Sequence, residues 1–173
     1  VAFMNHAMKS YSHIKFEQSI MKSKRLTQAY VNMVCDIVLR RFVEIRQDGQ
    51  KMVIYFATVD FCTIAAEELK RRHPTLNVTR YVSDDDYSEM LECDIIVSTL
   101  KSLGTAIDVP GLRVGLMTDA LGSMQANLQC AGRLRRMKDW PDVSPEFLYL
   151  VNGDIQRHVD YHEKKRDIFK GRV

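Results

Sequence analysis

The sequence predicts an α/β fold: a three-layer sandwich in which helices cover both faces of a mainly parallel sheet, preceded by a helical extension. Short apolar runs of strand length alternate with segments of helical periodicity, the order that parallel strands and crossover helices require. The runs are apolar throughout, as expected for strands that are buried on both faces. The 173 residues are enough for one domain with a substantial core.

Residues 1–27 are interpreted as a connecting, partly helical extension, and residues 28–173 as the domain itself. From Thr27 to about residue 45, apolar side chains recur at spacings of three and four, which predicts a helix that Gly49 then stops. Because the first residue is Val and no targeting segment follows, we expect the chain to be a piece of a longer protein.

Five strands follow in the predicted order. They are expected at residues 52–57, 76–82, 94–98, 112–117 and 147–151. Asp60 is expected to cap the helix after the first strand, because its carboxylate can accept hydrogen bonds from free backbone N–H groups. Helices are also predicted after Ser83, over about residues 123–137, and over residues 155–169.

Ligands of open parallel sheets bind at the carboxyl ends of the strands. The loops after residues 57, 98 and 117 are therefore expected to lie together at one edge of the sheet and to carry the function. No internal repeat interrupts the alternation of strands and helices.

The stretch from Gln129 to Arg136 carries the most specific chemical pattern. On a helix Gln129, Arg133 and Arg136 stand at i, i+4 and i+7 and share one face. A planar guanidinium matches phosphate oxygens and stays charged near neutrality, so this face suits a phosphate group. Gly132 costs about 1 kcal/mol inside a helix, which is tolerable where a ligand or a second backbone approaches closely. The alternative is a solvated basic face with surface ion pairs.

The spacing Q-x-x-G-R-x-x-R, formed by Gln129, Gly132, Arg133 and Arg136, resembles motif VI of superfamily-two helicases and translocases. The resemblance implies a RecA-like fold and places Gln129 and Gly132 in an ATP site. It implies that Arg133 and Arg136 are catalytic arginine fingers for ATP held by another domain. Such fingers accelerate phosphoryl transfer by a factor of about 10³–10⁵.

The loop after the third strand resembles motif V of the same superfamily. The resemblance assigns Thr99, with its neighbour Ser98, to a nucleic-acid phosphate and Asp108 to the surroundings of the ATP ribose. Ala106 stands where the family has a glycine, and Gly104 two residues earlier is the remaining glycine that could approach the nucleotide.

Residues 52–61 resemble motif IV, in which Thr58 would contact the nucleic-acid backbone. The three motifs occur in order between residues 51 and 151. The loop between motifs and the closing segment around residues 158–162 resemble those of large-bacteriophage helicases that remodel branched DNA. The sequence contains neither G-x-x-x-x-G-K-[ST] nor a D-E-x-H box. ATP and Mg are therefore expected mainly on an N-terminal RecA-like domain that this chain lacks, and the chain alone is expected to be inactive.

The predicted function is thus the second motor domain of an ATP-dependent DNA helicase, with single-stranded or branched DNA favoured over RNA as partner. One alternative is a nucleic-acid-binding module with a RecA-like fold and no catalysis. Another is a small-molecule α/β enzyme, although no nucleophile and base pair is evident at the strand ends.

The composition is that of a globular protein and excludes a membrane-spanning segment. Hydrophobic content is 46%, charged content is 27%, and no run of 18 apolar residues could cross a membrane. A net charge of +3 is compatible with a nucleic-acid partner.

Four cysteines, at positions 35, 62, 93 and 130, form no C-x-x-C pair. They are expected to be reduced core thiols of a cytoplasmic protein, in the host cytoplasm if phage-encoded. His158 and His162 have the spacing of a metal pair, but no metal is expected there.

Overall fold

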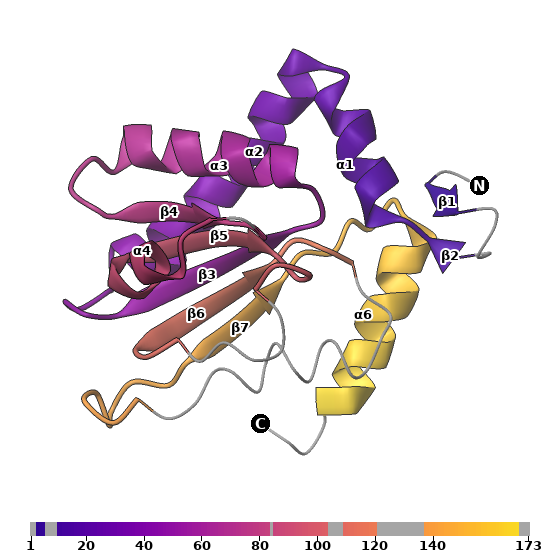
Figure 1. Ribbon diagram of the computed structural model, residues 1–173. Helices are drawn as coiled ribbons and strands as arrows, with labels where there is room; N and C mark the ends of the chain where they lie inside the picture. Colours follow the sequence, from indigo (N-terminus) through magenta and orange to yellow (C-terminus); the bar gives the residue numbers. More distant parts are fainter. Residues whose placement is uncertain (1–2, 6–9, 84, 104–108, 121–136, 170–173) are drawn as a thin grey trace.

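The computed structural model describes residues 3–5, 10–83, 85–103, 109–120 and 137–169. Its centre is a five-stranded, all-parallel sheet in the order β4-β5-β3-β6-β7 (Figure 1). The strands are β3 (Lys51–Phe56), β4 (Val78–Tyr81), β5 (Ile95–Thr99), β6 (Leu112–Met117) and β7 (Glu146–Tyr149). The predicted α/β sandwich with a parallel sheet is therefore confirmed.

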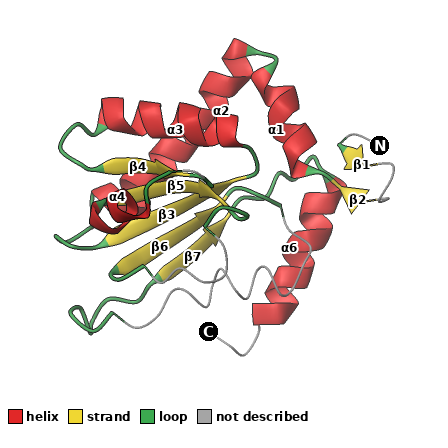
Figure 2. Ribbon diagram, in the orientation of Figure 1, coloured by secondary structure: helices red, strands yellow, loops and turns green. Residues whose placement is uncertain are grey.

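Helices and a small hairpin surround this sheet (Figure 2). The hairpin is β1 (Met4–Asn5) with β2 (Ser10–Tyr11). The helical elements are α1 (His13–Met21), α2 (Lys24–Val38), the π-helix η1 (Leu39–Val43), α3 (Val59–Arg72), α4 (Tyr87–Glu92) and α6 (Gln156–Phe169). No described helix has the length and hydropathy needed to span a bilayer.

The two faces of β3 pack into two separate clusters, as expected for a strand buried on both sides. Met52 and Ile54 on one face belong to the cluster formed with α2 and α3. Val53 and Tyr55 on the other face belong to the cluster that includes Met90 of α4. Parallel crossovers thus cover both faces of the sheet.

Two local predictions are corrected. Thr58, and not Asp60, is the N-cap of α3, because its side chain accepts a hydrogen bond from Phe61 N at 3.3 Å and Asp60 lies in the first turn. Helix α2 begins at Lys24, three residues earlier than expected, because Ser23 caps it by accepting from Leu26 N. The extension is helical as predicted and forms α1.

Candidate functional site

The loops after β3, β5 and β6 leave from the same edge of the sheet. Phe56 at the end of β3 is in register with Thr99 at the end of β5. Tyr55 is in register with Met117, and its carbonyl accepts hydrogen bonds from the backbone N and the hydroxyl of Thr118, at 3.1 and 2.7 Å. The expected convergence of these strand ends is therefore found.

Thr99 and Ser98 differ in what their hydroxyls contact. Thr99 is 8% exposed, and its Oγ1 accepts from Ser102 N at 3.1 Å while donating to Ser102 Oγ at 2.9 Å. Ser98 is fully buried and donates to the carbonyl of Tyr81 on β4. Thr99 thus shapes the turn that opens the loop, whereas Ser98 joins two strands. The nucleic-acid contacts of both residues stay predictions.

Thr58 lies at this edge and is hydrogen-bonded to a residue of the N-terminal extension. Its backbone N and its Oγ1 both donate to Glu17 Oε2, at 2.8 and 2.6 Å, and Ala57 N donates to Glu17 Oε1 at 2.8 Å. Glu17 is 0% exposed. Burial raises the pKa of Glu17 to about 7, although the hydrogen bonds from Thr58 and Ala57 act in the opposite direction.

Next to Glu17, a chain of hydrogen bonds joins the extension to α6. Asn152 N donates to Nδ1 of His158 at 3.2 Å, which leaves the His158 proton on Nε2 to bond the Tyr11 hydroxyl at 2.6 Å. His13 Nδ1 lies 3.1 Å from that hydroxyl and accepts from Ala120 N at 3.3 Å. His13 therefore carries its proton on Nε2, which lies 3.9 Å from Glu17 Oε1.

His13 and His158, the two histidines in this chain of hydrogen bonds, are buried and neutral. Burial lowers the pKa of His13 to about 3 and that of His158 to about 4. Asp119 Oδ1 lies 4.0 Å from His13 Nδ1, and burial raises the pKa of Asp119 to about 6. We call Glu17, His13, His158 and Asp119 the buried titratable cluster. Sequence reasoning missed Glu17, His13 and Asp119, because nothing in their local sequence marks them.

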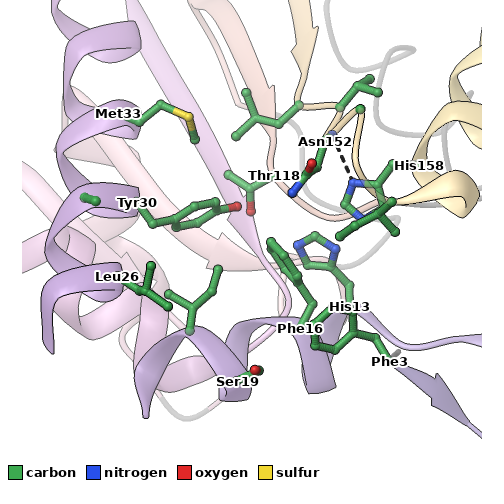
Figure 3. Close-up of a pocket in the computed structure, with 16 residues that line it drawn as sticks. Phe3, His13, Phe16, Ser19, Leu26, Tyr30, Met33, Thr118, Asn152 and His158 are labelled. Atoms are coloured by element: carbon green, nitrogen blue, oxygen red, sulfur yellow. Dashed lines mark hydrogen bonds between the residues drawn. The ribbon is translucent and has the colours of Figure 1, made fainter. Parts of the chain in front are cut away.

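A cavity of about 700 Å³ lies between α1, α2 and the loop that joins β7 to α6 (Figure 3). Most of its lining is apolar and includes Phe16, Leu26 and Met33, which come from α1 and α2. His13 and Thr118 add polar groups to its wall (Figure 3). The docking of α1 on the domain is thus incompletely packed.

The described residues offer no metal site, because no group of three His, Cys, Asp or Glu side chains in them could hold an ion. His158 bonds Tyr11, while His162 Nδ1 lies 3.1 Å from the Tyr149 hydroxyl, so each ring has its own partner. The three cysteines in the described part of the chain are free and buried, as predicted.

The remaining predicted site residues lie outside the described residues. They are Gly104, Asp108, Gln129, Gly132, Arg133 and Arg136, together with Cys130 and most of the predicted helix 123–137. The two segments that contain them follow β5 and β6. Leu103 and Val109 border the first segment and Ala120 and Met137 the second, and all four are buried.

An all-parallel sheet in this order, with helices on both faces, is the RecA-like α/β fold. Solved structures that share this fold include two that contain helicase domains or helicase-family chains in their own right. Saccharomyces cerevisiae Dbp5 bound to Gle1 and IP6 superimposes with a TM-score of 0.60 at 14% identity, covering 80% of this chain and 36% of that one. The Pyrococcus furiosus Hef helicase domain gives a TM-score of 0.54 at 17% identity, covering 84% of this chain and 34% of that one.

This chain thus spans about a third of the length of either neighbour. At these identities the likeness establishes the fold alone. No protein-family model matches the sequence, and no curated protein matches it significantly.

Proposed function

We propose that the chain is the second motor domain of an ATP-dependent superfamily-two helicase or translocase. The observation that carries the proposal is that Thr58, two residues after β3, and Thr99, the last residue of β5, follow adjacent strands at one edge of the sheet. The two motif-bearing threonines lie at the edge from which the segment with Arg133 and Arg136 also departs. The neighbours' RecA-like fold supports the same assignment.

In this function, ATP and Mg are held mainly by an N-terminal RecA-like domain, and residues 28–173 close on them. Arg133 and Arg136 stabilise charge on the transferred phosphoryl group, since guanidinium groups bind phosphate oxygens bidentately. Gln129, Gly132 and the loop with Gly104 and Asp108 complete the nucleotide site.

Thr58, Thr99 and Ser98 belong to the track for nucleic acid. Hydroxyl contacts to phosphates position a strand without reading its sequence. Single-stranded or branched DNA is the proposed substrate, RNA is less favoured, and a phage source acting in the host cytoplasm follows from the resemblance of the motifs. Residues 1–27 form an extension that adjoins the motor domain.

The test is ATP hydrolysis by a protein that contains both motor domains, measured without nucleic acid, with single-stranded DNA, with branched DNA and with RNA. We expect stimulation by DNA and a smaller maximal stimulation for Thr99→Val than for wild type. Stimulation by RNA alone would reject the DNA assignment. No hydrolysis by folded protein that nevertheless binds nucleic acid would favour the non-catalytic binding module.

A further inference from the structure

Three donors at the end of β3 converge on one anionic group. They are the backbone N of Ala57, the backbone N of Thr58 and Thr58 Oγ1, and each lies within 2.8 Å of a Glu17 oxygen. They stand at the N-terminus of α3, a helix of 14 residues, where the helix dipole also favours negative charge. The group that occupies this position comes from α1, a separate element of the extension.

We propose that Glu17 is an intramolecular competitor of nucleic acid: its carboxylate occupies the donors of Ala57 and Thr58, and α1 must withdraw before a backbone phosphate can bind them. The inference rests on the proposed function, which assigns Thr58 to the nucleic-acid track. It adds that the extension is autoinhibitory.

The Glu17 carboxylate and a nucleic-acid phosphate can each accept hydrogen bonds from the donors of Ala57 and Thr58. A carboxylate and a phosphodiester each carry one negative charge shared by two oxygens, and both form charge-assisted hydrogen bonds with backbone N–H and hydroxyl groups. Thr58 is only partly buried, and the next two residues, Val59 and Asp60, are exposed. A strand approaching from solvent therefore reaches the site once Glu17 has left.

Burial of Glu17 is costly, which favours a reversible contact. A carboxyl group that is 0% exposed loses its hydration, and this burial raises its pKa to about 7. An apolar side chain at this position would avoid the cost of burying a charge but would leave the donors of Ala57 and Thr58 without this acceptor. The contact is thus strong enough to form and weak enough to be exchanged for another anion.

Helix α1 can leave without dismantling the core. The buried cluster between α2, α3 and the sheet includes no residue of α1, and Ile20 and Met21 only pack against it. A pocket of about 700 Å³, partly open to solvent, lies beside Phe16, so part of the surface of α1 that faces the domain makes no contact with it. Lys22 and Ser23 separate α1 from α2, and Ser23 caps the start of α2, so α2 can stay in place.

Displacement of α1 would also break a hydrogen bond next to the segment that contains Arg133 and Arg136. His13 on α1 accepts a hydrogen bond from Ala120 N, and residue 121 begins the segment with Arg133 and Arg136. Nucleic acid at Thr58 would thereby release a contact at the start of that segment. Binding and catalysis would be linked through the extension.

The first test measures the affinity of this chain for fluorescent oligo-dT and oligo-rU of about 20 nucleotides by anisotropy at constant salt. We expect Glu17→Ala to tighten binding by about tenfold or more, because a charge-assisted competitor is removed. Glu17→Gln keeps the size and loses the charge, and should lie between wild type and Glu17→Ala. Adding Thr58→Val to Glu17→Ala should abolish most of the gain.

Asp60→Asn is the matched control. Asp60 is an exposed acid in the first turn of α3, two residues from Thr58, and its loss changes the local charge without vacating the donors. Equal tightening by Asp60→Asn and Glu17→Ala would overturn the proposal in favour of general electrostatics. Wild-type binding that Glu17→Ala leaves unchanged would overturn it while leaving the proposed function intact. Absence of binding by every variant, Glu17→Ala included, would overturn this proposal, whereas the hydrolysis assay of the two-domain protein decides the proposed function separately.

A second readout uses the wild-type chain. Hydrogen exchange of the α1 amides (His13–Met21) should become faster when the oligonucleotide is added, whereas the amides of β3 and α2 should stay protected. Slower or unchanged exchange in α1 in the bound state would show that nucleic acid does not displace it, and would overturn the proposal even if Glu17→Ala fails to fold.

Discussion

Acidification should affect the wild-type chain and Glu17→Gln very differently, because the buried titratable cluster contains two acids and two bases that compensate each other. Glu17 and Asp119 have pKa values raised from 4.5 and 3.8 to about 7 and about 6. His13 and His158 have pKa values lowered from 6.5 to about 3 and about 4. The wild-type cluster is therefore expected to make stability nearly independent of pH between 7 and 5.

The direction follows from proton counting. An acid with a raised pKa binds its proton more readily in the folded chain, so it adds stability at low pH that is lost as pH rises through the folded pKa. A histidine with a lowered pKa stabilises above its unfolded pKa of 6.5 and loses this stability as pH falls toward 3 or 4. From pH 7 to 5 the folded chain gains about 1.3 protons on the acids and the unfolded chain gains about 1.5 protons on the histidines.

Glu17→Gln removes one of the two acids that compensate the histidines. The unfolded variant then binds about one proton more than the folded variant from pH 6.5 to 4.5, and at about 1.4 kcal/mol per proton and pH unit the variant loses about 3 kcal/mol that wild type keeps. Any constant cost of the amide at this site shifts the whole curve without changing its slope.

Urea unfolding, followed by the fluorescence of the single tryptophan Trp140 at several pH values from 7 to 4.5, measures these slopes. Glu67→Gln, which removes an exposed carboxyl group from α3, is the control and should run parallel to wild type. If the free energy of unfolding of Glu17→Gln falls no more steeply than that of wild type, the compensation does not exist.

Three further predictions concern the backbone, the extension and catalysis. Gly111→Ala should lower the free energy of unfolding by about 2 kcal/mol or more, because φ of Gly111 is +74° and the added Cβ would lie 2.6 Å from Gly49 O. The control is Gly153→Ala, whose new Cβ has no atom within 4 Å and which should change the free energy of unfolding little in the same urea titration. Tyr11→Phe should cost about 1–2 kcal/mol and speed hydrogen exchange in α1, because it breaks the link between the two buried histidines. Arg136→Ala in the two-domain protein should cut kcat by about 10³-fold or more with unchanged circular dichroism, and unchanged turnover would remove its finger role.

The strands could be predicted because their signal is local. A continuous apolar run is sufficient to indicate a strand buried on both faces, and the predicted bounds 112–117 coincide with those of β6. Parallel topology then predicted that Thr58 and Thr99 would approach the same edge. Helix caps were less certain from sequence, since Thr58 and Asp60 can both accept a hydrogen bond and only the end of β3 at Phe56 decides between them.

The buried titratable cluster could not be predicted, because its contacts join distant parts of the chain. Glu17 lies 40 and 41 positions from its partners Ala57 and Thr58, and His13 lies 107 positions from Ala120. An acid in a short amphipathic helix ordinarily faces solvent, so composition and periodicity place Glu17 on the surface. The burial of Ser98 could not be predicted for the same reason. Its hydroxyl donates to a carbonyl of β4, and the local sequence does not show that β4 pairs with β5.

The compensation within the cluster bears on what could move α1. Between pH 7 and 5 the docked chain takes up protons on Glu17 and Asp119, which favours docking, whereas release of α1 would allow His13 and His158 to take up protons, which favours release, and the two effects nearly cancel. A change in pH between 7 and 5 is therefore a poor signal for release. The three donors at Ala57 and Thr58 need new acceptors once Glu17 has left, and negatively charged oxygens form the strongest hydrogen bonds with them. A ligand that brings its own negative oxygens, as a nucleic-acid backbone does, is therefore a better competitor of Glu17 than a change in pH.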